Sequence, residues 1–324
     1  MVEELPNRRP LLKTWYRVVH EENRLLLEYG HSLLAFEGRA AAVLLPRLLP
    51  LLDGTRTIDD VVNVLGPGTR AAVENAVALL DEHQLLTSAA DPEHATDRIV
   101  DGSIAFLAAT GSVSVARAST ALRETVVSVV GAGAGADETA RLLRLSGLEQ
   151  VERRPLDDRP DGPALAVVCP SPAELPRLLD WNARALASET PWLQLLPFDG
   201  RLFAVGPLYV PGETACYNCY LCRRLSHSGY DEPEFWAIER EASRSPEPVF
   251  AQTASAALAT GVVLSWVTSA NPFLPGILYA LEWGRSVALT QHTVYRVPRC
   301  PACSGLDDLA PPNPWYEEPL DVSP

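Results

Sequence analysis

The sequence predicts a two-part α/β protein, with a small winged-helix-like domain of three strands and three helices preceding a larger α/β domain. Three observations support this fold class. Short strand-like segments precede leucine-rich helical segments in residues 12–83. A run of β-branched residues enters a glycine-rich turn at 126–135, which is typical of a nucleotide-type βαβ unit. Two Cys-x-x-Cys pairs, at 216–219 and 300–303, predict a metal site that holds distant segments together.

Composition limits the possible functions. A length of 324 residues suggests about two domains, and 47% hydrophobic residues are enough to build cores for both. The formal net charge of −14 argues against binding to nucleic acid or to anionic membrane surfaces.

The sequence also predicts a soluble, cytoplasmic protein. No charged-then-apolar leader opens the chain, and the longest apolar stretch, Ala254–Val267, contains polar residues and is too short to span a membrane. Five of the six cysteines lie in Cys-x-x-Cys clusters. Such clusters favour a metal in a reducing compartment over a disulfide framework.

The N-terminal segment alternates between two faces. Residues 14–19, 25–29 and 32–36 predict three strands joined by turns at 21–23 and 30–31. A leucine-rich helix is expected over Ala40–Leu52, with Pro46 tolerated or kinking it. Thr57 is a suitable N-cap for the next helix, and a third helix is expected over Thr69–His83.

The stretch DGTRT-I-x-x-V-V, beginning at Asp53, makes residues 8–90 resemble a PqqD-like recognition element. The resemblance implies that the leader of a ribosomally made precursor peptide adds as a strand to residues 32–36 and places its side chains against the third helix. The residues that would line this groove are Leu33, Leu34, Ala35, Phe36, Ala72, Asn75, Ala76 and Leu79. A DNA-binding winged helix and a plain packing domain are the alternatives, and the acidic balance argues against DNA.

A polar linker is expected over residues 88–97, followed by a strand over Ile104–Ala108 and a helix over Val115–Arg123. The βαβ unit then begins at strand Val126–Val130. The pattern Gly131-Ala-Gly133-x-x-Ala136, with Gly135 between, matches a dinucleotide fingerprint, but such a match on its own is weak. We interpret the unit as a retained nucleotide-type fold whose binding pocket is vestigial.

The acidic residues near this turn give little support for a bound nucleotide. Asp137 and Glu138 lie at the helix N-terminus, where a phosphate needs free N–H groups and a positive dipole end. Glu152 is the only candidate for the acid that would hold a ribose.

Strand and helix continue to alternate after this unit, which predicts a parallel-type sheet. Strands are expected at Ala164–Cys169, Trp192–Pro197 and Leu202–Tyr209, with a helix over Ala173–Ala187. Further on, the sequence predicts a helix within 231–246, a buried alanine-rich helix over Phe250–Val267, and a hairpin turning at Gly284-Arg285. The proline-rich tail, 310–324, is expected to be extended and either docked on a partner or disordered.

Cys216, Cys219, Cys300 and Cys303 can together complete a tetrahedral Cys₄ site for structural Zn²⁺, with no open position for a substrate. The pair Cys219-x-x-Cys222 and redox dithiol chemistry are the alternatives. Cys169, at a strand end, is most simply a buried core residue.

The glycine-rich unit followed by P-G-x-x-x-C-x-x-C and a final C-x-x-C resembles the E1-like, ThiF-type superfamily over residues 98–305. Active members adenylate a carboxylate with ATP, using a basic clamp and a magnesium-binding Asp. Here no lysine follows Lys13, and the Asp position reads Cys169-Pro170-Ser171. Cationic clamps supply much of the stabilisation of such transition states, so no ATP chemistry and no catalytic residues are expected.

A PqqD-like element followed by an E1-like domain without adenylation residues resembles the leader-binding partner protein of YcaO cyclodehydratases, the bacteriocin cyclodehydratase C protein. It implies a recognition domain at 1–90, a zinc-binding E1-like domain at 91–309 and a tail at 310–324. The implied role is to present a precursor leader to a YcaO-type enzyme that forms azolines, without catalysis of its own and as a homodimer or heteromer. The alternatives are an E1-like adenylating enzyme of the microcin or pantocin type and a zinc-stabilised scaffold that binds no leader.

Overall fold

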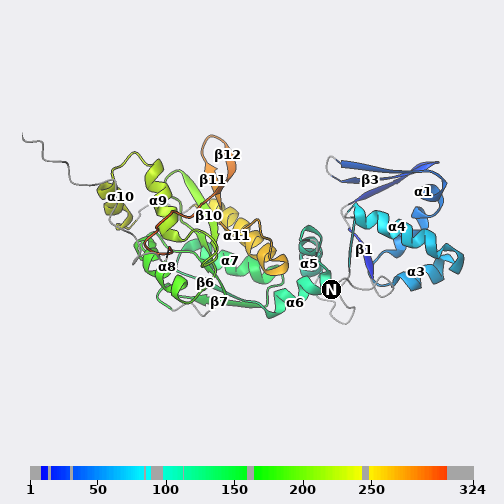
Figure 1. Ribbon diagram of the computed structural model, residues 1–324, viewed down its shortest axis with the longest axis horizontal. Coiled ribbons are helices and arrows are strands. Elements are labelled where there is room, and N and C mark those ends of the chain that lie inside the picture. The colour runs from blue at the N-terminus through cyan, green and yellow to red at the C-terminus, as the bar shows by residue number, and fades with distance from the viewer. Residues whose placement is uncertain are drawn as a thin grey trace, which may run out of the picture. The chain divides into compact units, whose positions relative to one another are not determined.

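The computed structural model describes residues 9–13, 16–29, 32–83, 85–88, 98–111, 113–158, 164–242 and 248–304. The chain forms two compact units (Figure 1). Unit 1 comprises Met1–Glu124, Leu145–Glu149 and Leu264–Asn271, and unit 2 comprises Thr125–Arg144, Gln150–Val263 and Pro272–Pro324. The predicted linker falls mostly, and the predicted tail wholly, outside the described residues.

Unit 1 contains the three predicted strands as one antiparallel sheet. β2 (Arg17–His20), β3 (Arg24–Tyr29) and β4 (Ser32–Glu37) lie in the order β2-β3-β4. Leu25 and Leu27 on β3 are fully buried, which fixes the face of the sheet that meets the helices. A second small sheet, absent from the prediction, pairs β1 (Pro10–Leu12) with β5 (Leu86–Ser88).

The single helix predicted over Ala40–Leu52 is wrong. The segment forms three short pieces, α1 (Arg39–Val43), α2 (Leu45–Leu48) and the 3₁₀ turn η2 (Leu49–Leu51). Each break lies beside a proline, Pro46 or Pro50, which has no N–H to donate and is tolerated only in the first turn of a helical piece.

The next two helices follow the prediction closely. α3 (Ile58–Leu65) begins with a capping box, in which the Thr57 side chain and the Asp60 side chain each accept a backbone N–H from the other residue. After a 3₁₀ turn, η3 (Pro67–Thr69), α4 (Arg70–Glu82) buries Val73, Val77 and Leu80 on one stripe. This stripe and the buried leucines of β3 share one core.

A helix replaces the strand predicted over Ile104–Ala108. α5 (Arg98–Thr110) packs on α6 (Val115–Glu124), which was predicted. The buried residues Ile104, Leu107 and Ala108 recur at helical spacing, so a helix buries them together where it packs on α6.

Unit 2 is built on a mixed seven-stranded sheet in the order β12-β11-β10-β9-β8-β6-β7. The first four strands of this unit in the sequence are parallel: β6 (Val126–Val130), β7 (Gln150–Arg154), β8 (Leu165–Val168) and β9 (Trp192–Leu195). The last three are antiparallel: β10 (Leu202–Tyr209), β11 (Ile277–Trp283) and β12 (Val287–Thr293). The expected parallel sheet is correct for β6 to β9 and wrong for β10, which a short turn joins to β9 in an antiparallel pair. The hairpin predicted around Gly284-Arg285 is confirmed as the β11–β12 pair.

Helices cover both faces of this sheet, and β9 shows which helix lies on which face. Trp192 contacts Trp181 of α8 (Leu178–Ala187) and Tyr217 of α9 (Tyr217–His227). Leu195, on the opposite face by alternation, lies beside Gly135 of α7 (Ala134–Leu145). The 3₁₀ turn η5 (Leu175–Arg177) leads into α8, and α10 (Glu232–Glu239) follows α9.

The alanine-rich helix is longer than predicted. α11 (Val249–Ser269) has 21 residues and is, by length and apolar composition, long enough to cross a membrane, contrary to the expectation that this stretch is too short. Half of its most apolar window is buried within the protein, and Ala251 packs with Phe203 and Leu281 of the sheet. These contacts place the start of the helix in a core cluster of unit 2.

Candidate functional site

A long apolar groove lies on unit 1 between the β4 strand and the α4 helix. Its volume is about 590 Å³, which is in the range of ligand sites. Its lining consists of residues from β4, α4 and the short helices between β4 and α3, namely Leu34, Ala35, Phe36, Glu37, Ala41, Leu44, Leu45, Ala72, Asn75, Ala76, Leu79, Leu80 and His83.

Seven of the eight residues predicted for a peptide groove lie around this space, and Leu33 does not. Leu33 is 60% exposed and points to the other face of the sheet, because successive residues of a strand alternate between faces. Sequence reasoning missed the floor residues Ala41, Leu44 and Leu45, since they were assigned to one continuous helix. That a peptide binds in the groove stays a prediction.

The strand beside the groove has one open edge. Within the described residues, β4 pairs with β3 alone. Exposed strand edges carry unpaired N–H and C=O groups that can accept a further strand. The groove therefore combines apolar walls with a row of main-chain hydrogen-bonding groups.

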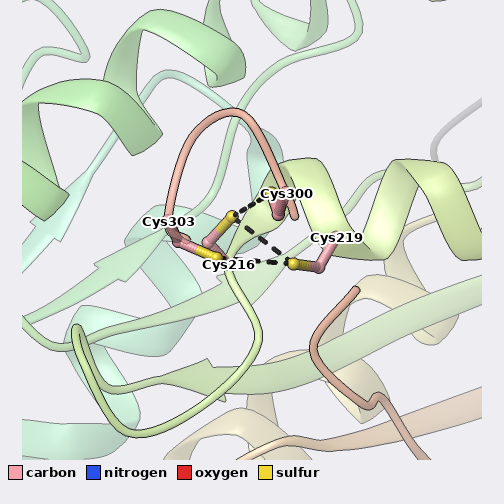
Figure 2. Close-up of side chains that lie close together, drawn as sticks. All are labelled: Cys216, Cys219, Cys300 and Cys303. Atoms are coloured by element: carbon pink, nitrogen blue, oxygen red, sulfur yellow. Dashed lines mark hydrogen bonds between the residues drawn. The ribbon is translucent and has the colours of Figure 1, made fainter. Parts of the chain in front are cut away.

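The four predicted metal ligands converge in unit 2, as Figure 2 shows. Their Sγ atoms all lie within 4.8 Å of one another, and the adjacent pairs Cys216–Cys300, Cys216–Cys219 and Cys219–Cys303 are 3.7, 3.9 and 3.6 Å apart. A tetrahedral ion with about 2.3 Å bonds to four sulfurs needs a sulfur–sulfur spacing of about 3.8 Å. The four thiols can therefore hold a metal ion.

The surroundings of the cluster suit thiolates. The Val297 N–H points to Cys219 Sγ at 3.3 Å, and the Asn218 side-chain amide points to Cys300 Sγ at 3.4 Å. A hydrogen bond from the Cys216 thiol lowers the pKa of Cys219 to about 4, and the same bond together with burial raises the pKa of Cys216. The two shifts describe one shared proton, which a bound cation would displace.

The two remaining cysteines lie apart from this cluster. Cys222 is not among the four converging residues, so the alternative pair Cys219-x-x-Cys222 has no geometric support in the described residues. Cys169 is buried, and desolvation raises its pKa to about 12, so its thiol stays protonated and unreactive.

The glycine-rich turn between β6 and α7 is packed shut. A Cβ added at Gly131 would lie 2.5 Å from the Cys169 carbonyl oxygen, and one at Gly133 would lie 2.6 Å from the Pro170 carbonyl oxygen. The cavity beside Gly133 and Gly135 has a volume of only about 20 Å³, roughly the space of one water molecule. Close approach of two backbone turns thus accounts for these glycines without a nucleotide.

A carboxylate of the chain itself, that of Glu174, accepts one N–H of this turn and two donors from the turn after β8. Glu174 Oε2 accepts the Ala132 N–H at 2.8 Å and the Ser171 N–H at 2.8 Å. The Ser171 hydroxyl donates to the same oxygen at 3.0 Å. The sequence signal for this contact was Ser171-x-x-Glu174, a capping-box pattern before a helical segment.

An arginine closes the turn on its other side. The Arg153 guanidinium donates to the Val129 and Gly131 carbonyl oxygens at 2.6 and 3.0 Å, and it pairs with Asp137 at 3.0 Å. Asp137 lies in the first turn of α7, where it was predicted to oppose a phosphate. Glu152, the candidate ribose acid, instead pairs with Arg154.

No protein-family model matches the chain, and no curated protein matches it in sequence. Solved structures share its fold. A heterocyclase in complex with substrate and cofactor is 23% identical with a TM-score of 0.70, over 92% of this chain and 40% of that chain. The heterocyclase TruD is 24% identical with a TM-score of 0.70, over 91% of this chain and 43% of that chain.

A third structure, MccB from E. coli with AMPCPP and MccA, is 14% identical with a TM-score of 0.64, over 91% of this chain and 99% of that chain. At these identities the likeness shows the fold alone. The chain spans about two fifths of the heterocyclases' length and matches nearly the whole of MccB.

Proposed function

We propose that this protein captures the leader of a ribosomally synthesised precursor peptide in the groove between β4 and α4. The observation that carries the proposal is the juxtaposition of the open β4 edge with the apolar groove. Main-chain hydrogen bonds along the edge would supply affinity, and the groove would select side chains. The exposed position of Leu79, at 42%, leaves apolar surface for a ligand to cover.

The leader-bound protein would deliver the precursor to a YcaO-type cyclodehydratase, which uses ATP to form thiazolines and oxazolines. Holding the leader raises the effective concentration of the core peptide at the partner's active site. Support comes from the heterocyclases that share this fold over about two fifths of their own length, one of them in complex with its substrate and cofactor. In this account the protein has no catalytic residues.

Zn²⁺ is the ion proposed for the four cysteines. A complete set of four thiolates favours zinc and leaves no coordination position for a substrate, so the ion would have a structural role. It would tie the N-terminus of α9 to the segment around Cys300 and Cys303, far apart in the sequence.

A second candidate is a peptide-adenylating enzyme, because MccB structures with ATP or AMPCPP share the fold over nearly their whole length. The closed turn and the carboxylate of Glu174 count against it. Titration with Mg-ATP by calorimetry distinguishes the two, since a capture protein gives no heat of specific binding and no pyrophosphate exchange. Tight binding or exchange would establish the adenylating role instead.

The groove is tested by fluorescence polarisation with labelled leader peptides encoded by genes beside this one. Leu79→Asp and Leu34→Asp should each weaken binding at least tenfold, because a carboxylate would replace an apolar contact in the groove. Val64→Asp is the matched control, since Val64 is 59% exposed on α3 and does not line the groove. Circular dichroism and zinc content should stay constant in all three, and unchanged affinity in both groove variants would exclude this site.

A further inference from the structure

The main-chain groups of β4 alternate between the sheet and the open edge. The Arg24 carbonyl of β3 accepts the Glu21 N–H, and the Gly38 N–H donates to the Asn23 carbonyl. Antiparallel pairs alternate between hydrogen-bonded and non-hydrogen-bonded residues, so these two bonds fix the phase of the whole sheet. With Phe36 opposite Leu25 and Leu34 opposite Leu27, the main chains of Phe36 and Leu34 bond to β3.

The N–H and C=O groups on the open edge therefore belong to the alternate residues Leu33, Ala35 and Glu37. No hydrogen bond from their main chains to another segment occurs within the described part of the chain. A strand added here bonds to these three residues, and its own bonded positions stand directly opposite them.

The side chains that enter the groove are set by the other alternation. Phe36 is 9% exposed and meets the His83 ring edge-on with centroids 6.1 Å apart, so its face of the strand looks toward α4. Leu34 packs on the same core. Directly opposite residues of paired strands share a face, so the added residues opposite Phe36 and Leu34 would lie over Ala76 and Leu79.

The edge of the groove is acidic at the Phe36 end. Its lining includes one carboxylate, Glu37, one histidine, and no lysine or arginine. Glu37 stands opposite Arg24 in the sheet, whose guanidinium hydrogen-bonds to Glu21. A residue added opposite Glu37 would lie on the same face of the sheet as Glu37 and close to its negative charge.

We propose, on the basis of the function proposed above, that the groove recognises a short antiparallel motif read from N to C as cation, apolar, any residue, apolar. The cation stands opposite Glu37, the first apolar side chain opposite Phe36, the free position opposite Ala35 and the second apolar side chain opposite Leu34. The occupant is an extended segment of the precursor leader, selected by apolar side chains spaced two residues apart.

The anchor spacing is tested with a fluorescein-labelled host peptide, Gly-Ser-Thr-Lys-Leu-Thr-Leu-Thr-Ser-Gly, and the full-length protein. An isomer with the two leucines adjacent, Lys-Thr-Leu-Leu in place of Lys-Leu-Thr-Leu, has the same composition and charge. It should bind about tenfold more weakly, because only one leucine reaches the groove in any single register. Equal affinity of the two peptides overturns the spacing.

The register is tested by moving one methyl group along the host peptide backbone. Methylating the nitrogen of the threonine between the leucines removes the donor to Ala35, and affinity should fall at least tenfold. Methylating the nitrogen of the first leucine, whose N–H points away from β4, should change affinity less than twofold. The reverse order, or equal loss from both, overturns the register.

The charge preference is tested by replacing the peptide lysine with glutamate. The loss in affinity should be about twofold to fivefold, as for exposed ion pairs, and should vanish in Glu37→Gln. Equal loss in both proteins would remove Glu37 from the motif.

Failure of the motif and failure of the proposed function give different results. If natural leaders bind and Leu34→Asp abolishes binding, but spacing and methyl position have no effect, the groove stands and the motif is wrong. If neither host peptides nor leaders bind, the proposed function itself fails.

Discussion

At the scale of single residues, Glu174 is the contact that most changes what the glycine-rich turn can do. Its carboxylate accepts the Ala132 N–H, which in a nucleotide-binding turn would face a phosphate, and also the Ser171 N–H of the turn after β8. The contact joins the turn after β6 to the turn after β8. An internal anion has the same charge as a phosphate but cannot leave, so the fold is kept while the ligand position is filled.

Removing this carboxylate should destabilise unit 2. Glu174→Ala leaves two N–H donors without their charged acceptor, and the free energy of unfolding should fall by about 1–3 kcal/mol. Glu174→Gln keeps one acceptor oxygen and should lose less. Glu213→Ala is the control, since Glu213 lies in unit 2, is exposed and has no side-chain bond within the described residues. Urea unfolding measures all three, and equal losses in Glu174→Ala and Glu213→Ala would show that the contact has no net effect.

At the scale of elements, the capping box fixes where α3 begins. The Thr57 hydroxyl and N–H both bond to Asp60, and these bonds lower the pKa of the Asp60 carboxyl below its usual range. A depressed pKa in the folded state means that the contribution is present above the unfolded pKa and is lost as pH falls through the folded one.

Thr57→Ala should therefore lower the stability of unit 1 by about 1 kcal/mol at neutral pH. Thr57→Ser keeps the hydroxyl and should restore most of it. The difference between the alanine and serine variants should shrink in acid, as the pH falls through the lowered pKa of the Asp60 carboxyl. Thermal unfolding across this pH range provides the measurement, and a pH-independent difference would contradict the role of Asp60.

Elements also show what could be predicted from sequence. Strands β6 to β8, helix α7 and the Cys-x-x-Cys pairs were predictable, because β-branched runs, glycine turns and ligand spacing are local signals. The apolar run at Ile104–Ala108 is compatible with a strand or a helix, and only its packing on α6 decides. The β1–β5 pair joins segments far apart in the sequence, and the contacts of Glu174 and Arg153 depend on which turns become neighbours.

At the scale of the whole molecule, the four cysteines define what holds unit 2 together beyond its sheet. They connect α9 to the segment that follows β12, so an ion there closes a long loop. Binding of a metal to the native state alone adds its binding free energy to folding.

Thiol labelling should report this ion. In the native, metal-loaded protein, an alkylating reagent should modify only Cys222, which is half-buried and outside the cluster. Acidification protonates the thiolates, so metal should leave as pH falls, and labelling after removal and return to neutral pH should add the four cluster cysteines. Cys169 should react only after unfolding. Modification of the cluster cysteines in the native protein would argue against a bound metal.

Replacing one of the four proposed ligands should affect the protein more than replacing Cys222. Cys216→Ser should lower metal content and soluble yield, whereas Cys222→Ser should leave both unchanged. A folded Cys216→Ser protein without zinc would refute a structural metal.

The central claim is that β4 accepts a peptide strand along its open edge. The direct measurement is residue-resolved amide hydrogen exchange by NMR, with and without a saturating leader peptide. The account predicts that the amides of Leu33, Ala35 and Glu37 become protected, while those of Leu34 and Phe36, already bonded to β3, change little. The account would be contradicted if the peptide left the exchange rates of these three amides unchanged, or if it slowed exchange only in unit 2.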